Sequence, residues 1–194
     1  RPSSRDAYQR HRLFERLDEM AHFPVIWISA PAGSGKTTLA SSYVAYRGGR
    51  CLWYQMDRDD TDPATFFYYV TEALKHEIPG IPLTLPLFTP EYLQGIPSFT
   101  RRFFESLFKI LPENTLMVFD NYHELPDDSP LHGIIQTAFS RVPEGFTIIT
   151  TSRKGPSPEL SRLKANQVLG CLGWDDLRLT EEEASGIVAI RSEH

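Results

Sequence analysis

Residues 26–38 read IWISAPAGSGKTT, an apolar run that leads into a glycine-bearing loop and then into Gly-Lys-Thr-Thr. The next residues, LASSYVA at 39–45, suit a helix, so the stretch has the strand, loop and helix context of a phosphate-binding (Walker A) loop. Gly33 and Gly35 let the backbone turn so that successive N–H groups point at one centre. The helix adds its unpaired N-terminal N–H groups and its positive dipole end. The stretch therefore predicts a binding loop for a nucleoside phosphate.

Several side chains of this loop have defined partners in that pattern. Lys36 would reach the β- and γ-phosphates, and the Thr37 hydroxyl would hold Mg²⁺. The pattern departs at its first position, where Ala30 replaces glycine and restricts the entry to the loop. The predicted nucleotide-binding residues of the loop are Ala32, Gly33, Ser34, Gly35, Lys36, Thr37 and Thr38.

Strand-like and helix-like runs alternate along the rest of the chain. Strands are expected near residues 25, 52, 117, 148 and 169, which predicts an α/β fold: a three-layer sandwich around a parallel sheet, as in P-loop NTPases. The spacing allows the strand order 5-1-4-3-2 of the additional-strand class. We expect a helical lead-in at 1–22, a nucleotide-binding domain at 23–174 and the start of a helical lid at 175–194.

The run TLMVFD at 115–120 is apolar up to a final carboxylate. Such a strand belongs in a parallel sheet that is covered on both faces. Ligands of these sheets lie beyond the carboxyl ends of the strands, so Asp120 should emerge beside the phosphate-binding loop. There it suits the Walker B acid that fixes Mg²⁺ and its water, and we predict Thr37 and Asp120 as the metal-binding pair.

Arginines supply two further candidates. Arg153 follows the apolar run 146–151, where a cation at the same sheet edge can stabilise the γ-phosphate; the alternative is a surface arginine. The amphipathic segment 1–22 is either a charged surface helix or places Arg10, His11 or Arg12 at the base of the nucleotide. Of these three we name Arg12 as the candidate.

Composition narrows the class of protein. The formal net charge of −5 over 194 residues argues against a dedicated nucleic-acid binder. No apolar run approaches the roughly 20 residues that span a bilayer, and no signal peptide is visible. Cys51 and Cys171 lack metal-ligand spacing and read as buried thiols of a reducing compartment. We expect a cytoplasmic protein and, because the sequence starts at Arg1 without methionine, a segment of a longer chain.

The chain resembles the nucleotide-binding domain of the signal-transduction ATPases with numerous domains (STAND). Within them it is similar to the branch of the bacterial maltose-regulon activator and the large LuxR-type transcriptional regulators. The resembling stretches are 30–38 (APAGSGKTT), Trp53-Tyr54 with the aspartate turn and Phe66 after it, 118–123 (VFDNYH), 151–153 (TSR) and 176–184 (DLRLTEEEA).

The resemblance implies a switch rather than a fast enzyme. An ADP-bound resting form would exchange for ATP and self-associate through this domain, and DNA would be contacted only by an effector domain elsewhere in the protein. The branch commonly has a second acid after the strand, where this chain has Asn121. Asparagine can orient a water but cannot accept its proton. We therefore predict slow hydrolysis with Lys36, Asp120, Asn121 and Arg153 as the catalytic set, and Glu124 as a substitute base.

Two other classes of function stay open at the level of sequence. One is a small-molecule kinase in which the proline-rich excursion 79–97 closes over an acceptor, although this excursion contains no Arg or Lys. The other is a non-catalytic interaction scaffold that holds nucleotide only for stability. Phosphoryl transfer to an added acceptor would identify the kinase, and assembly that depends on the nucleotide would separate the switch from the scaffold.

Overall fold

A parallel sheet of five strands forms the centre of the computed structural model, which describes residues 2–3, 7–48, 50–80 and 84–192. The strand order is β2-β3-β4-β1-β5. Read from the opposite edge this is 5-1-4-3-2, so the predicted fold class and order are confirmed. The strands are β1 (Val25–Ser29), β2 (Cys51–Gln55), β3 (Leu116–Asp120), β4 (Thr147–Ser152) and β5 (Leu169–Leu172).

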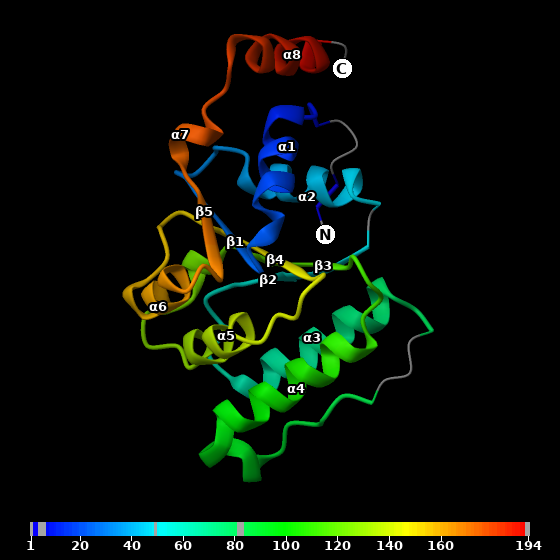
Figure 1. The fold of residues 1–194 in the computed structure, drawn as a ribbon, viewed down its shortest axis with the longest axis vertical. Helices are drawn as coiled ribbons and strands as arrows, with labels where there is room; N and C mark the ends of the chain where they lie inside the picture. The colour runs from blue at the N-terminus through cyan, green and yellow to red at the C-terminus, as the bar shows by residue number, and fades with distance from the viewer. Residues whose placement is uncertain (1, 4–6, 49, 81–83, 193–194) are drawn as a thin grey trace.

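Helices cover both faces of the sheet and make three layers (Figure 1). Successive side chains of a strand point to opposite faces. In β1, Ile26 and Ile28 join one buried cluster, whereas Val25 and Trp27 join the other. The first cluster is covered by α1 (His11–Glu19), α2 (Lys36–Tyr46) and α7 (Trp174–Leu177). The second is covered by α3 (Pro63–Glu77), α4 (Ile96–Ile110), α5 (Leu131–Phe139) and α6 (Ser161–Ala165).

The last helix, α8 (Glu181–Ser192), lies beyond α1 and away from the sheet (Figure 1). It begins with a capping box: the Glu183 N–H donates to Oγ1 of Thr180 at 3.2 Å, and the Thr180 N–H donates to Glu183 Oε2 at 3.1 Å. No helix among the described residues is both long and apolar enough to cross a membrane.

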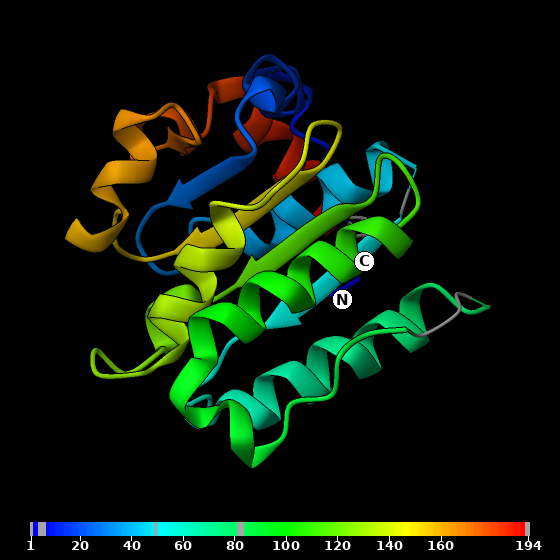
Figure 2. The same cartoon turned by 60° about the horizontal axis from the view of Figure 1, so that its bottom comes forward.

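The proline-rich excursion packs on the face opposite α1 and α2. Phe88 stacks on Phe67 of α3 with ring centroids 5.4 Å apart, and Tyr92 lies 4.7 Å from Phe99 of α4. Figure 2 shows this return path beside α3 and α4. Residues 81–83 of the excursion lie outside the described residues. The other short elements are the 3-10 turns η1 (Met20–His22), η2 (Pro90–Gly95), η3 (Tyr122–Glu124) and η4 (Pro158–Leu160).

The excursion is shorter than the sequence predicted, because α4 begins inside it at Ile96. Pro97 then occupies the first turn of the helix. A missing N–H costs nothing at that position, since the first turn has no intrahelical acceptor for it. The prediction extended the excursion to residue 97 and so missed this start.

Candidate functional site

The loop between β1 and α2 turns at its two glycines. Gly33 has φ +76° and Gly35 has φ +80°, a left-handed conformation that side chains with a Cβ rarely adopt. An added Cβ would meet nothing within 4 Å at either position, so conformation rather than space requires glycine. Ala30, at the entry of the loop, is buried, and its N–H donates to the carbonyl of Ser152 at 3.3 Å. The loop is thus tied to the end of β4.

Lys36 is the first residue of α2, and its side chain folds back over the loop. Its ammonium group donates to the carbonyls of Ala30 and Pro31 at 2.8 Å each and to Ser34 Oγ at 3.2 Å. Burial, and next the Arg153 guanidinium, lower the pKa of Lys36 below its ordinary value, while Asp120 opposes the shift. A buried cation that is held by loop carbonyls can exchange these partners for phosphate oxygens.

Asp120 ends β3 beside the loop and collects two hydroxyl donors on one oxygen. Thr37 Oγ1 donates to its Oδ1 at 2.9 Å, and Thr151 of β4 donates to the same oxygen. The side chain is 1% exposed. A carboxylate and a hydroxyl oxygen this close together are hard ligands of the kind that Mg²⁺ takes alongside nucleotide phosphates. The donor set therefore fits the metal expected from the sequence.

Asn121 follows in the left-handed region, with φ +61° and ψ +37°. Asparagine tolerates this conformation better than most residues with a Cβ. Its N–H donates to Thr151 Oγ1 at 3.1 Å, so Thr151 links the backbone of Asn121 to the Asp120 carboxylate. These hydrogen bonds fix the position of the Asn121 backbone, from which its side chain extends.

Charged groups beyond Asn121 form a cluster at the same sheet edge. Arg153, half exposed, lies 3.6 Å from Oε1 of Glu124, and Glu124 also accepts from Nε of Arg58 at 3.2 Å. The Trp27 indole donates to the carbonyl of Lys154 at 3.0 Å and so holds the chain just after Arg153. Glu124 is thereby engaged by two cations, which makes it a weaker proton acceptor than a free carboxylate.

His123 belongs to this cluster, although no role was predicted for it from the sequence. Its side chain is buried. Nε2 lies 3.1 Å from Oε1 of Glu124, an ion pair when the ring is protonated, although neither ring nitrogen makes an aligned hydrogen bond to a described residue. Burial, and next the charge of Arg153, lower its pKa, with the Glu124 carboxylate opposing. The only sequence signal is its place three residues after the acid that ends β3.

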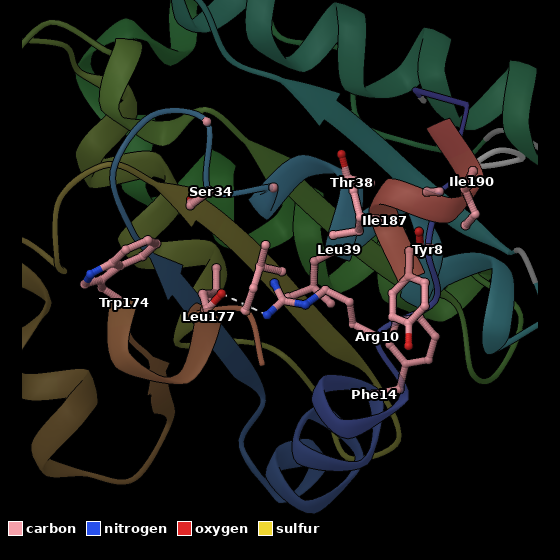
Figure 3. A pocket seen from close by; sticks show the side chains of 15 residues that line it. Tyr8, Arg10, Phe14, Ser34, Thr38, Leu39, Trp174, Leu177, Ile187 and Ile190 are labelled. Atoms are coloured by element: carbon pink, nitrogen blue, oxygen red, sulfur yellow. Dashed lines mark hydrogen bonds between the residues drawn. The ribbon is translucent and has the colours of Figure 1, made fainter. Parts of the chain in front are cut away.

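A pocket of about 430 Å³ opens on the other side of the loop, within the size range of small-molecule sites. It lies between the loop, α2, the segment before α1 and the C-terminal helices (Figure 3). Arg10 lines it, whereas Arg12 is not among the described residues that do. Instead Arg12 is 44% exposed at its side chain and donates to the carbonyl of Asp176 at 3.0 Å. The sequence analysis named Arg12, and the structure has Arg10 rather than Arg12 in the wall of this pocket.

Most of the predicted site residues thus fall into two places. Gly33, Ser34, Gly35 and Thr38 line the pocket. Lys36, Thr37 and Asp120 meet at the head of α2, with Arg153 near enough to affect the pKa of Lys36. The sequence missed the remaining walls of the pocket, which come from distant segments: Ala7, Tyr8, Phe14, Leu39, Ser42, Trp174, Leu177, Leu179, Ile187 and Ile190.

Comparison with known proteins points to one family. Residues 5–153 match the family described as nephrocystin 3, N-terminal. The HTH-type transcriptional regulator MalT of Cronobacter sakazakii is 27% identical over 177 residues, which cover 90% of this chain and 19% of that protein. MalT of Vibrio cholerae is 25% identical over 199 residues, covering 97% and 22%. The chain therefore spans about a fifth of the length of these relatives.

Solved structures share the fold at low identity. A Walker-type ATPase of Pyrococcus abyssi aligns with a TM-score of 0.57 and 12% identity, over 97% of this chain and 59% of that one. The RuvB Holliday junction branch migration motor of Thermotoga maritima aligns with a TM-score of 0.50 and 14% identity, over 100% and 54%. These likenesses support the P-loop NTPase fold.

Proposed function

The chain belongs to the family described as nephrocystin 3, N-terminal, as a STAND-like P-loop domain of the MalT-like regulators, and from this premise we propose that it is an ATP-binding switch. The domain binds Mg²⁺-ATP or ADP, hydrolyses ATP slowly, and passes its nucleotide state to the rest of a larger regulator through self-association. Contact with DNA belongs to another part of that regulator.

One observation carries the proposal: a phosphate-binding end and a base-sized pocket adjoin on the same loop. Lys36, Thr37 and Asp120 meet at one end of the loop. The pocket begins at Gly33 and Ser34 and continues along α2. A nucleoside triphosphate needs both ends at once, because its phosphates are anionic and its base is flat and largely apolar.

Each step of the proposed slow hydrolysis is assigned to particular residues of the site. Lys36 and the α2 N-terminus bind the β- and γ-phosphates, and Thr37 and Asp120 would hold Mg²⁺, which neutralises charge on the phosphates. Asn121 orients the attacking water through its amide oxygen but cannot take its proton. Arg153 stabilises charge on the γ-phosphate, and its ion pair with Glu124 must loosen for it to do so. A poor proton acceptor makes the bound triphosphate long-lived, as a switch requires.

The part of the switch that moves is α8, which lies in the expected helical lid at 175–194. In α8, Glu183 pairs with Arg10 at 2.8 Å, so the lid is fastened to the segment that also lines the pocket. A ligand that contacts Arg10 acts on the same group that fastens the lid. Nucleotide binding and lid position are therefore coupled through one side chain.

The described part of the excursion argues against the kinase alternative. Its Phe88 and Tyr92 pack on the α3 and α4 face, and none of residues 84–97 lines the pocket. An acceptor-closing segment would have to reach the γ-phosphate end of the loop. This segment is instead anchored on the opposite face of the sheet.

The test is a titration of the full-length regulator with ATP and with ADP in Mg²⁺, followed by mass measurement with light scattering. We expect both nucleotides to bind and only the ATP form to gain mass. Binding without any difference in mass between the two forms would favour the scaffold, and absence of binding would refute a nucleotide switch. Phosphoryl transfer to an added acceptor would make it a kinase.

A further inference from the structure

Glu124 lies in η3 between two arginines that come from other parts of the chain. Its Oε2 accepts from Nε of Arg58, after β2, at 3.2 Å, and its Oε1 lies 3.6 Å from Nη2 of Arg153, after β4. The hydrogen bond from Arg58 is the main cause that lowers the pKa of Glu124 below its ordinary value, so the carboxylate is ionised at neutral pH. Glu124 therefore places a negative charge beside Arg153.

The two arginines are held unequally. Arg58 makes a hydrogen bond, whereas the 3.6 Å between Arg153 and Glu124 is too long for one. The Arg153 side chain is 54% exposed, and ion pairs that water can screen contribute little to stability. Within the described part of the chain, this is the one ion pair that Arg153 makes. Arg153 can therefore leave Glu124 at a small cost in free energy.

The backbone around Arg153 does not have to move for such an exchange. The Trp27 indole donates to the carbonyl of Lys154 at 3.0 Å, and the Lys154 N–H donates to Ser152 Oγ at 3.1 Å. Ser152 itself ends β4, which pairs with both β1 and β3. The Arg153 guanidinium therefore changes its partner by rotation of its side chain alone.

Arg153 also lies within electrostatic range of Lys36. After burial, the charge of Arg153 is the largest cause of the lowered pKa of Lys36, and the Asp120 carboxylate opposes the shift. Two cations this close repel each other, and an anion between them relieves the repulsion. The γ-phosphate that Lys36 is proposed to bind is such an anion, and ADP lacks it.

We propose that Glu124 competes with the γ-phosphate for Arg153 and so sets how strongly the domain prefers ATP over ADP, an inference that rests on the nucleotide binding proposed above. The free energy of parting Arg153 from Glu124 is subtracted from ATP binding only, because ADP leaves the pair in place. After Arg153 has left, Oε2 of Glu124 keeps Arg58, and Oε1 still lies 3.1 Å from Nε2 of His123. The carboxylate therefore remains partnered in both states.

The experiment is a calorimetric titration of the full-length regulator in Mg²⁺ with ADP and with adenylyl imidodiphosphate, an ATP analogue that keeps the γ-phosphate but resists hydrolysis. Glu124→Gln keeps the shape of the side chain and removes its charge. We expect its affinity for the ATP analogue to rise about threefold, as for the loss of a half-exposed ion pair, and its affinity for ADP to stay at the wild-type value. Arg153→Ala should lose about tenfold for the ATP analogue and nothing for ADP.

Two further variants show whether the effect depends on Arg153. When Glu124→Gln is combined with Arg153→Ala, it should no longer raise the affinity for the ATP analogue, because the two side chains interact only through their contact. Asp59→Asn removes the same charge from an exposed residue next to Arg58 in the sequence and should bind both nucleotides as wild type does. A structural role for Glu124 would instead change both affinities together.

The outcomes separate this proposal from the function on which it rests. If Glu124→Gln binds the ATP analogue no more tightly than wild type, or gains equally for ADP, competition for Arg153 is overturned while nucleotide binding stands. An equal gain with and without Arg153 would make the effect one of general charge and would also overturn it. So would an Arg153→Ala variant with wild-type affinity for the ATP analogue. Failure of wild type to bind either nucleotide would refute the proposed function itself.

Discussion

The two ends of the proposed nucleotide site, a phosphate end at the head of α2 and a base end in the pocket beside it, are built in opposite ways. At the phosphate end, Lys36 and Thr37 are neighbours in sequence, and both are already paired with groups of the protein. At the base end, Arg10 and Glu183 meet across 173 positions of the chain, and Arg10 Nε, Ser42 Oγ and Glu183 Oε1 lack partners among the described residues.

This difference assigns a separate task to each end. In the proposed switch, phosphate exchanges one set of charge-assisted bonds for another at the loop, so this end would supply the affinity and the chemistry. At the other end we propose that the base of the nucleotide occupies the pocket that Arg10 helps to line. Because Arg10 also pairs with Glu183 of α8 at 2.8 Å, we propose that occupancy of this end is passed on to α8.

The largest effect is expected where the base end meets the lid. Glu183→Ala leaves Arg10 buried without its carboxylate, and removing one partner of a buried pair costs about 3 kcal/mol or more. We expect the amides of α8 to exchange with solvent more than about a hundredfold faster. Glu182, the exposed residue next to Glu183, provides the control variant Glu182→Ala. Wild-type protection of α8 in Glu183→Ala would mean that other contacts hold the lid.

The next effect concerns chemistry at the phosphate end. Asn121→Asp supplies a proton acceptor in a backbone conformation that aspartate also tolerates, and general-base help is worth at least about a hundredfold in rate. Phosphate release at saturating Mg²⁺-ATP should rise accordingly. Asn114→Asp makes the same change at φ +61° in the turn before β3 and should leave the rate alone. A rate that falls in Asn121→Asp would place water activation elsewhere, with Glu124 the next candidate.

A smaller effect is expected on the contribution of Mg²⁺ to ATP affinity. Asp120→Asn removes the negative charge that faces Thr37, so we expect ATP affinity in Mg²⁺ to fall about tenfold more than ATP affinity in EDTA. Calorimetric titration under both conditions measures the difference. Equal losses of ATP affinity under the two conditions would mean that Asp120 does not hold the metal and only orders two hydroxyl groups at the end of β3.

The smallest expected effect is a dependence of lid docking on pH. Burial alone would raise the pKa of Glu183, but hydrogen bonds from Arg10, the Thr180 N–H and Arg12 outweigh it and lower the pKa below the ordinary 4.5. Its contribution to stability is therefore complete above pH 4.5 and is lost as the pH falls through the lowered value. Unfolding curves of wild type and Glu183→Gln should converge on acidification. A constant gap down to pH 3 would contradict this.

The phosphate end could be predicted from the sequence because its determinants are local. The loop, the start of α2 and the acid that ends β3 each stand in one short stretch, and the topology of parallel strands brings them to one edge. The base end lacks such a signal. Whether Arg10 or Arg12 faced the pocket depended on how the segment before α1 packs against α8, and Ser42 looks in sequence like any polar residue of a helix.

We propose above all that the loop at the head of α2 binds the phosphates of ATP. Lys36→Ala removes its buried cation, and charge-assisted bonds are worth about 1.5–3 kcal/mol, so the affinity for Mg²⁺-ATP should fall at least about tenfold. Lys164→Ala, at an exposed lysine of α6, should bind as wild type does. Calorimetric titration of the three proteins decides the matter. A Lys36→Ala variant that binds Mg²⁺-ATP as tightly as wild type would contradict the account.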